Sequence, residues 1–396
     1  MFHGGETPVG RVPAFRPAGQ AYFLRNPGHH ARISSFRIGY HRGRAMEQRY
    51  ADVKSGAPPS RSTTLRDVAD RAGVSVATAS RVVSGSAAVR PATRDRVERA
   101  IRDLLYVAPG RLEPSGAIGL LVPEFGNPVF AALAQAMETR ATAAGFATIL
   151  CNTAGSPLRE VDYVHMLLER RVEGMVFICS EITDVRGEHL HYVKLLEQGA
   201  RLVFVNGGSE SLPVTSVGVD ERASGRIATE HLLELGHRRI GFVAGDAFAL
   251  ATREKARGRE DALAAAGIDS PACAFHDGFT VEGGRRAFGA MLDAMNGDRP
   301  TAVICSNDLM AIGALQEALA RGLRVPDELS IVGFDGIEAA SWTHPALTTV
   351  EQPIGEIAET AIEALQALVH DPAQTLPTYV FRPQLRIGGT TAPPSR

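Results

Sequence analysis

Eight short apolar runs, each ending in a polar residue or a glycine, recur along the chain from residue 117 onward. They read "AIGLLVP", "FATILC", "GMVFIC", "RLVFVN", "TSVGVD", "RIGFVAG", "TAVICSND" and "LSIVGFDG". Segments with helical periodicity separate most of them, for example at residues 130–145, 163–171, 223–235 and 309–321. Strands that alternate with helices form parallel sheets with helices on both faces. Roughly 270 residues are too many for one such sheet, so the pattern predicts a core of two α/β lobes over residues 117–390, followed by a tail at 391–396.

The bulk composition fits a folded protein of two or three domains. The chain has 396 residues, 44% of them hydrophobic, and a formal net charge of -2. The near-neutral balance argues against uniform coating of a polyanion. The sequence contains neither a run of 18 apolar residues nor a secretory signal, so we expect no membrane partner. The cysteines, which lie far apart, fit a cytoplasmic location.

The four cysteines lie far apart and form no CxxC pair. They are Cys151, Cys179, Cys273 and Cys305. We expect buried, reduced thiols rather than a disulfide or a zinc site.

Residues 1–61 differ from the rest of the chain in charge and texture. Ten Lys or Arg residues stand there against three acids, and Pro and Gly are frequent. We expect a disordered basic extension without a specific role. Two alternatives stay open: a basic arm that adds non-specific attraction to DNA, and a translation start at Met46 that leaves residues 1–45 untranslated.

Residues 62–108 predict three short helices. Thr64 can cap the first helix, and Gly73 supplies the positive φ that a tight turn needs. Ser75 can cap the second helix, and Pro91 opens the third, as a first-turn proline does. A helix, a tight glycine turn and a second short helix form the helix-turn-helix pattern.

The second of these helices has a surface suited to the major groove of DNA. Val76 and Ala77 are small and can touch thymine methyl groups, and Arg81 can pair with guanine or a phosphate. The alternative is a three-helix subdomain without a nucleic-acid role. The charge favours DNA, because residues 62–108 hold eight arginines against five acids in a chain whose total is -2.

Several motifs in combination resemble one known family. "TLRDVADRAGVSVATASRVVSG" and "VRPATRDRVERAIRDLLY" closely resemble the headpiece of the lactose/galactose-repressor (LacI/GalR) family of bacterial transcription regulators. The likeness continues through "GVDERASGRIATEHLLELGHRRIGFVAG" to "LTTVEQP" and covers about residues 63–390. It implies a helix-turn-helix headpiece, a short hinge and a two-lobed core like that of periplasmic sugar-binding proteins. It also implies a repressor that binds an operator in double-stranded DNA as a homodimer. A small-molecule effector, of the carbohydrate type, controls the affinity for the operator.

The resemblance assigns DNA contacts residue by residue. Val76, Ala77 and Arg81 match the base-reading positions of the family. Four hydroxyl side chains match residues that hold phosphates or cap the recognition helix, with capping alone as the alternative: Thr64, Ser75, Thr78 and Ser80. Arg90 stands where an N-cap serine is usual before the third helix, and arginine is a poor cap but a good phosphate contact.

The linker at 109–116 departs from the family pattern. Family members usually have a longer link that folds on DNA into a hinge helix, with a leucine wedged into the minor groove. Here the link is broken by prolines and glycines, which disfavour a helix. Leu112 is the large apolar candidate for a wedge, with Arg111 beside it, and a plain linker is the alternative. We expect weaker bending of the operator than is usual in the family.

Ligands of open parallel sheets bind beyond the carboxyl ends of the strands. By resemblance, the effector pocket gathers polar, aromatic and basic side chains at those ends: Asn127, Phe130, Asn206, Arg253, Lys255, Phe279, Asn307 and Asp335. Asp220 is equally a pocket residue or a helix cap, and we expect Asp308 to cap the helix that begins at Leu309. Cys179 and Ser180 stand near the pocket mouth, where lining without contact is the simpler interpretation.

Lys255 stands where the family often has an arginine. The lysine ammonium is a point charge, whereas the arginine guanidinium is planar and can form two parallel hydrogen bonds, so bidentate recognition of the ligand is in doubt. Arg253 can compensate.

Two other classes of function compete with this interpretation. An enzyme is disfavoured because the sequence has no Walker A, GxGxxG, GxSxG or HExxH motif, so we expect no catalysis, cofactor or metal. A periplasmic-type solute-binding protein fits the core but neither the missing signal peptide nor the added headpiece. The C-terminus has no leucine heptads, so we expect a dimer rather than a tetramer.

Overall fold

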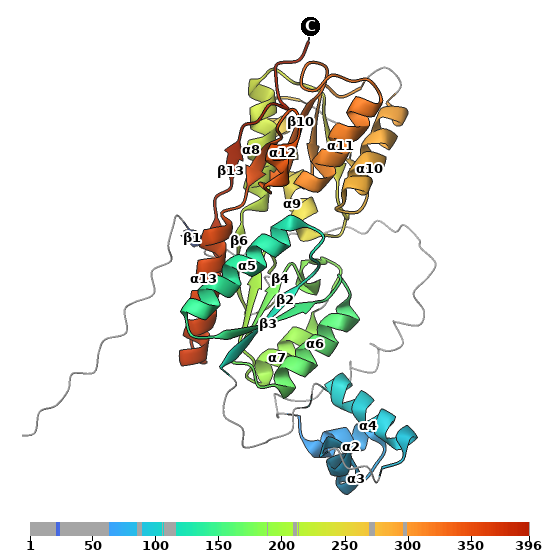
Figure 1. The fold of residues 1–396 in the computed structure, drawn as a ribbon, viewed down its shortest axis with the longest axis vertical. Coiled ribbons are helices and arrows are strands. Elements are labelled where there is room, and N and C mark those ends of the chain that lie inside the picture. Colours follow the sequence, from blue (N-terminus) through green and yellow to red (C-terminus); the bar gives the residue numbers. More distant parts are fainter. Residues whose placement is uncertain are drawn as a thin grey trace, which may run out of the picture. The chain divides into compact units, whose positions relative to one another are not determined.

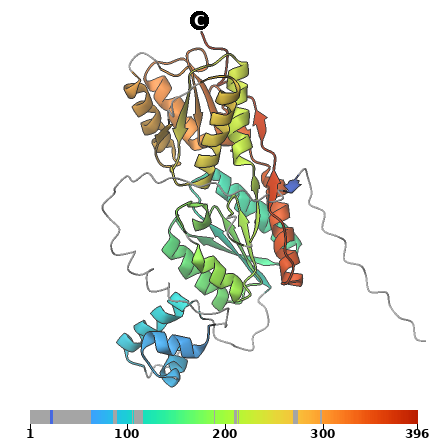
Figure 2. The ribbon, with the colours of Figure 1, turned by 180° about the vertical axis from the view of Figure 1, so that it is seen from behind.

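The computed structural model describes residues 21–23, 63–84, 89–104, 106, 116–187, 189–208, 212, 214–268, 274–295 and 299–395. Within them lie a headpiece, residues 63–106, and a core, residues 116–189 and 201–395. Figures 1 and 2 show the elements from two sides. Of the 1–61 extension only β1 (Ala21–Phe23) is described, a short strand that the expectation of disorder did not include.

The headpiece consists of three helices, as the sequence predicts: α2 (Leu65–Ala72), α3 (Val76–Val83) and α4 (Pro91–Leu104). Gly73 ends α2 with a φ of 63°, and Ser75 caps α3 by accepting a hydrogen bond from the Thr78 N–H. Apolar side chains from all three helices, with Tyr106 after α4, form a small core: Val68, Ala69, Ala72, Ala79, Val82, Val97, Ala100 and Tyr106. These contacts fix the turn between α2 and α3, and so fix which face of α3 stays exposed.

The first sheet of the core has seven strands in the order β1-β12-β6-β5-β4-β2-β3. Besides β1, they are β2 (Ala117–Val122), β3 (Ala147–Asn152), β4 (Met175–Ile178), β5 (Leu202–Val205), β6 (Thr215–Val219) and β12 (Tyr379–Phe381). All neighbours are parallel except β1 and β12. Helices α5 (Pro128–Ala143) and α13 (Ile354–His370) pack together over one face, visible beside the sheet in Figure 1. Alternate residues of β2 serve the two faces, because Leu120 joins that cluster while Gly119 lies against Leu167 of α6 (Pro157–Glu169).

The second sheet has six strands in the order β13-β11-β10-β9-β7-β8. They are β7 (Ile240–Ala244), β8 (Ala274–His276), β9 (Ala302–Cys305), β10 (Ser330–Asp335), β11 (Thr348–Glu351) and β13 (Gln384–Arg386). Helices α8 (Glu221–Glu234) and α9 (Leu250–Ala265) pack on the face of Val332 and Phe334. Helices α10 (Val281–Ala294) and α11 (Asp308–Ala320) pack on the opposite face, with Ile331. Both faces are covered, which is why the strands read as continuous apolar runs.

The core is the predicted pair of α/β lobes. The chain passes between the sheets three times, after β6, after β11 and after β12. The eight predicted strands are all present, and the short strands β8, β11, β12 and β13 were not predicted. Helix α6 begins six residues before the predicted 163, because Ser156 caps it and Pro157 occupies its first turn. The remaining elements are the 3-10 helix η2 (Glu181–Thr183), α7 (Leu190–Glu197) and α12 (Ala339–Trp342).

The C-terminal residues pack onto the second lobe. His237 is buried, and its imidazole nitrogens lie 2.9 Å from Thr301 Oγ1 and 2.9 Å from the Ala392 carbonyl oxygen. Thr391 lies 3.0 Å from the ring of His231. Residues 391 and 392, assigned from the sequence to a tail, therefore belong to the folded lobe.

Two further expectations concern cysteines and membranes. Cys151, Cys179 and Cys305 are free thiols, and Cys273 lies outside the described residues. In the described part of the chain, the helices are all too short or too polar to cross a bilayer.

Candidate functional site

The outward face of α3 presents the residues expected to meet DNA. Five of them are exposed: Ser75, Val76, Ala77, Ser80 and Arg81. Thr78 is half-buried, while Ala79 and Val82 point into the headpiece core. Arg81 forms no ion pair with another described side chain, so its guanidinium is available to a ligand. The sequence spacing thus places small side chains and one arginine together on one exposed face.

The hydroxyl side chains at the helix starts are engaged in capping. The Thr64 hydroxyl accepts from the Asp67 N–H, and the Thr64 N–H donates to Asp67 Oδ2 at 2.7 Å, which forms a capping box. The same hydroxyl also donates to Asp67 Oδ2 at 2.6 Å. Ser75 Oγ lies 2.9 Å from Thr78 Oγ1. The carbonyl of the exposed Arg90 accepts hydrogen bonds from the N–H groups of residues 93 and 94, so Arg90 stands at the start of α4. Arg111 and Leu112 lie outside the described residues, and their hinge role stays a prediction.

A cavity of about 690 Å³ opens between the two lobes of the core. Its walls come from the carboxyl ends of strands in both sheets. The lining side chains that carry polar or aromatic groups are Glu124, Phe125, Asn127, Phe130, Asn152, Cys179, Thr183, Asn206, Glu221, Lys255, Phe279, Thr280, Ser306, Asn307, Asp335 and Gln352. This is the place where open parallel sheets bind ligands.

Seven of the nine predicted pocket residues line this cavity: Asn127, Phe130, Asn206, Lys255, Phe279, Asn307 and Asp335. Arg253 does not line it, because its position on α9 leaves it exposed to solvent, whereas Lys255 two residues later is buried. Asp220 does not line it either, since its carboxylate caps α8 by accepting from the Ala223 N–H at 2.8 Å. Of the two roles left open for Asp220, the structure supports the cap.

Asp308 was expected to cap a helix starting at Leu309, and this expectation was wrong. Helix α11 starts at Asp308 itself, and Asn307 caps it by accepting from the Met310 N–H at 2.9 Å. Asp308 is fully buried and accepts from the Thr349 hydroxyl at 2.6 Å and from the Ile337 N–H at 2.9 Å. It braces the loop that follows β10. Burial, reinforced by the charge of Asp335, raises its pKa well above the ordinary value.

The polar side chains that line the cavity form one ion pair and one hydrogen-bonded chain. Lys255 Nζ lies 2.5 Å from Glu221 Oε2, with side chains 6% and 17% exposed. Gln352 donates to Asp335 Oδ1 at 2.8 Å and accepts from Asn206 Nδ2 at 2.7 Å. Asn206 belongs to the first lobe and Asp335 to the second, so Gln352 bridges the lobes.

The electrostatics of the cavity follow from its burial. Desolvation raises the pKa of Asp335 to about 7, although Lys255 and the hydrogen bond from Gln352 act to lower it. Desolvation, with added repulsion from Glu221 and Asp335, raises the pKa of Cys179 to about 12. A thiol with such a pKa is a poor nucleophile at neutral pH. The arrangement suits a hydrogen-bonding ligand better than covalent chemistry.

Four non-glycine residues of the lining have a left-handed backbone: Cys179, Asn206 and Asp335, with φ values of 42°, 52° and 102°, and Ala154, with 51°. The first three stand at the ends of strands. Such conformations store strain and gather at functional sites. They turn these side chains toward the cavity instead of continuing the strands.

Eight polar or aromatic lining residues were not predicted as pocket residues: Glu124, Phe125, Asn152, Thr183, Glu221, Thr280, Ser306 and Gln352. Glu221 and Gln352 matter most, because they pair with Lys255 and Asp335. Glu221 directly follows the strand-end residue Asp220, so the pair "DE" indicated that either acid could enter the pocket. Gln352 follows a strand that was not predicted, in the family-like motif "LTTVEQP". The aromatic Phe125 was also missed, although it stands between two predicted features, the first strand and Asn127.

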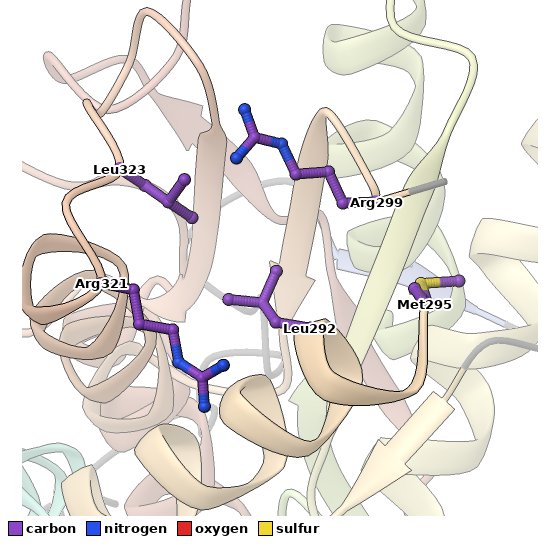
Figure 3. Close-up of a pocket in the computed structure, with 5 residues that line it drawn as sticks. All are labelled: Leu292, Met295, Arg299, Arg321 and Leu323. Carbon is purple, nitrogen blue, oxygen red and sulfur yellow. The ribbon is translucent and has the colours of Figure 1, made fainter. Parts of the chain in front are cut away.

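A second hollow, of about 430 Å³, is formed by residues near the C-terminal ends of α10 and α11 and just before β9 (Figure 3). Leu292, Leu323 and Met295 supply its apolar surface, and Arg299 and Arg321 its basic groups. Arg321 is ion-paired with Asp293 and Glu317, and Arg299 lies 3.7 Å from Glu328. Because both cations are paired with acids of their own lobe, the interlobe cavity remains the better candidate for a ligand.

Comparisons with known proteins bear on both the headpiece and the core. The model for "Bacterial regulatory proteins, lacI family" matches residues 64–108, and that for "Periplasmic binding protein-like domain" matches residues 229–391. The chain is 40% identical to an uncharacterized HTH-type transcriptional regulator in the aml 5' region of Streptomyces limosus, over 83% of this chain and 94% of that protein.

Two solved structures resemble most of the chain. One is a complex of the transcriptional regulator CelR with cellobiose, 30% identical, with a TM-score of 0.65 over 83% of this chain and 99% of that one. The other is the lac repressor dimer bound to operator and the anti-inducer ONPF, 27% identical, with a TM-score of 0.63 over 84% of this chain and all of that one, 100%.

These relatives are transcriptional regulators, and the match at 64–108 disfavours a solute-binding protein without a DNA role. Identity and coverage on this scale extend through headpiece and core together. The chain belongs to the LacI family of bacterial regulatory proteins, which are DNA-binding regulators of transcription.

Proposed function

We propose that this regulator is a cytoplasmic repressor that binds its operator as a homodimer and is controlled by a carbohydrate held between its lobes. The observation that carries the proposal is the interlobe cavity, because both sheets contribute strand-end amides, carboxylates and aromatic rings to it. A polyol offers hydroxyl groups that pair with the amides and carboxylates, and apolar ring faces that stack on Phe130 and Phe279.

On the DNA side, Val76, Ala77 and Arg81 read bases, and Arg90 contacts a phosphate. The exposure of these four residues supports the assignment. Thr64, Ser75, Thr78 and Ser80 help to hold the recognition helix at the backbone, the first two through their role as caps. The lac repressor structure is a dimer bound to operator, which supports binding of two headpieces to two half-sites.

On the effector side, Asn127, Asn206, Lys255, Asn307 and Asp335 supply the polar contacts. The cavity binds and does not catalyse, a view supported by the raised pKa of Cys179. Closure of the lobes on a ligand changes the spacing of the two headpieces in the dimer. A small rotation is enough to prevent simultaneous contact with two half-sites.

The test is a selection of operator sequences from random duplex DNA by the full-length protein, followed by titration of carbohydrates into the protein–operator complex. We expect one palindromic sequence to be enriched and at least one sugar to change its affinity. A protein that binds duplex DNA of every sequence equally, or that ignores sugars in the complex, contradicts the proposal. Sedimentation of the free protein checks the dimer.

A further inference from the structure

Positive charge inside the interlobe cavity is confined to one side chain among the described lining residues. Lys255 is the cation there, against the acids Glu124, Glu221 and Asp335. Its ammonium group lies 2.5 Å from Glu221 and 5.0 Å from the centre of the Phe334 ring. Glu221 therefore neutralises the positive charge of Lys255. The other acids of the lining, Glu124 and Asp335, leave its formal charge negative.

Helix N-termini are the other usual source of positive potential for an anion. Five helices of the core begin at a residue that lines the cavity or directly after one: α5, α8, α9, α10 and α11. Four of them are capped in the first turn by side-chain oxygens, those of Asn127, Asp220, Thr280 and Asn307, at 3.2, 2.8, 3.0 and 2.9 Å from the N–H groups. The N-terminus of α9, at Ala249, has no side-chain cap, but a helix end carries only about half an elementary positive charge.

An anionic ligand would meet this lining at a disadvantage. Entering a partly buried cavity strips water from the ligand, and a phosphate or carboxylate then needs a free cation to compensate. Lys255 can supply one only by leaving Glu221, which would strand a carboxylate that is 17% exposed. An uncharged polyol has no such requirement, because amides and carboxylates satisfy hydroxyl groups directly.

We propose that Glu221 determines the charge specificity of the pocket: by neutralising Lys255 it makes the regulator select an uncharged effector and reject phosphorylated or carboxylated analogues. This inference rests on the proposed carbohydrate function of the same cavity. Glu221 acts on the ligand partly through Lys255, so removing the Glu221 charge frees a cation at the binding site.

The experiment compares matched sugars by isothermal titration calorimetry on the full-length protein. The probes are glucose, trehalose and cellobiose, each beside its 6-phosphate. The natural protein is expected to bind at least one neutral sugar at least about tenfold more tightly than its phosphate, as one unfavourable charge contact at short range implies. A preference for the phosphate overturns this inference and leaves the carbohydrate function standing. Binding of none of these sugars overturns both.

Variants locate the selectivity. Glu221→Gln is expected to shift the ratio of phosphate to neutral affinity toward the phosphate by about tenfold or more, and Glu221→Gln combined with Lys255→Gln to abolish that shift. Glu230→Gln removes an acid from the exposed face of the same helix, where it pairs with Arg226, and is the matched control. An unchanged ratio in Glu221→Gln, with the melting temperature retained, overturns the inference.

A second variant keeps the test decisive if Glu221→Gln folds poorly. Lys255→Met leaves Glu221 without its partner, so rejection of the phosphates should become stronger relative to the neutral sugars. A weaker rejection would contradict the role given to the Lys255–Glu221 pair.

Discussion

We propose that specific recognition of DNA depends most on Arg81. It is exposed on α3 beside Val76 and Ala77, and a guanidinium can form two hydrogen bonds to one guanine. We expect Arg81→Ala to weaken operator binding by about 1–3 kcal/mol and to relax the preference at one base pair. Fluorescence anisotropy with the operator and its single-base variants measures both effects.

Arg102→Ala is the control for this prediction, because Arg102 is exposed near the end of α4. It should leave the base preference unchanged. Equal affinity and equal preference in Arg81→Ala would show that Arg81 reads no base.

The buried carboxylate of Asp335, which we propose contacts the ligand, lowers the stability of the ligand-free protein. Its pKa is about 7 in the folded protein, against an ordinary value near 3.9. The folded state therefore binds more protons than the unfolded state between these values, and stability falls as pH rises through this window. Asp335→Asn removes the buried charge, so we expect the ligand-free protein to melt roughly 2–4 °C higher at pH 8 and to depend less on pH.

Scanning calorimetry between pH 5 and 8 checks the Asp335 prediction. Asp308 retains part of the pH dependence, because burial also raises its pKa. The exposed Asp162 of α6 provides the control substitution to Asn. A steeper pH dependence in Asp335→Asn than in the natural protein would contradict the argument.

At the scale of elements, two glycines allow α8 and α9 to touch backbone to backbone. A Cβ added at Gly258 would lie 1.9 Å from the Arg222 carbonyl oxygen, and one at Gly225 would lie 2.1 Å from the Lys255 carbonyl oxygen. This approach is what brings Glu221 at the start of α8 to Lys255 on α9. We expect Gly258→Ala to push the helices apart, to destabilise the core by about 1–3 kcal/mol and to weaken sugar binding.

Gly355→Ala is the matched control, because a Cβ at that helical position in α13 meets nothing within 4 Å. It should be neutral or slightly stabilising, since alanine is the better helix former. Chemical denaturation and calorimetry compare the two variants. Equal stability of both would mean that the close approach of α8 and α9 is not required.

At the scale of the whole molecule, the proposed function requires that DNA binding by the headpiece and sugar binding in the pocket be thermodynamically coupled. If a sugar lowers operator affinity by some factor, the operator must lower sugar affinity by the same factor. For a coupling of about 1–3 kcal/mol the factor is about 5 to 150. Titrating sugar into the protein with and without operator, and operator with and without sugar, should return one common factor. Two different factors at equilibrium would mean that the species measured are not the same assembly.

Local signals determined much of the fold in advance. Thr64, Gly73, Ser75 and Pro91 gave the helices of the headpiece nearly to the residue, because caps and turns depend on a few neighbouring atoms. Apolar runs gave the main strands of both lobes, because a strand buried on both faces is apolar along its length. Helix α6 began earlier than predicted because its cap, Ser156, was overlooked and not because tertiary contacts overrode the sequence.

Only the tertiary structure decided which strand-end residues meet. Glu221, Lys255, Asp335 and Gln352 are far apart in the chain, and their pairing depends on the order of strands in two sheets and on the packing of α8 against α9. Sequence alone offered Arg253 beside Lys255 as a pocket residue and left Asp220 open between pocket and helix cap, yet Asp220 caps a helix and Arg253 faces solvent. Periodicity reports which way a side chain points within its own element, whereas a binding site requires several elements to aim at one point in space.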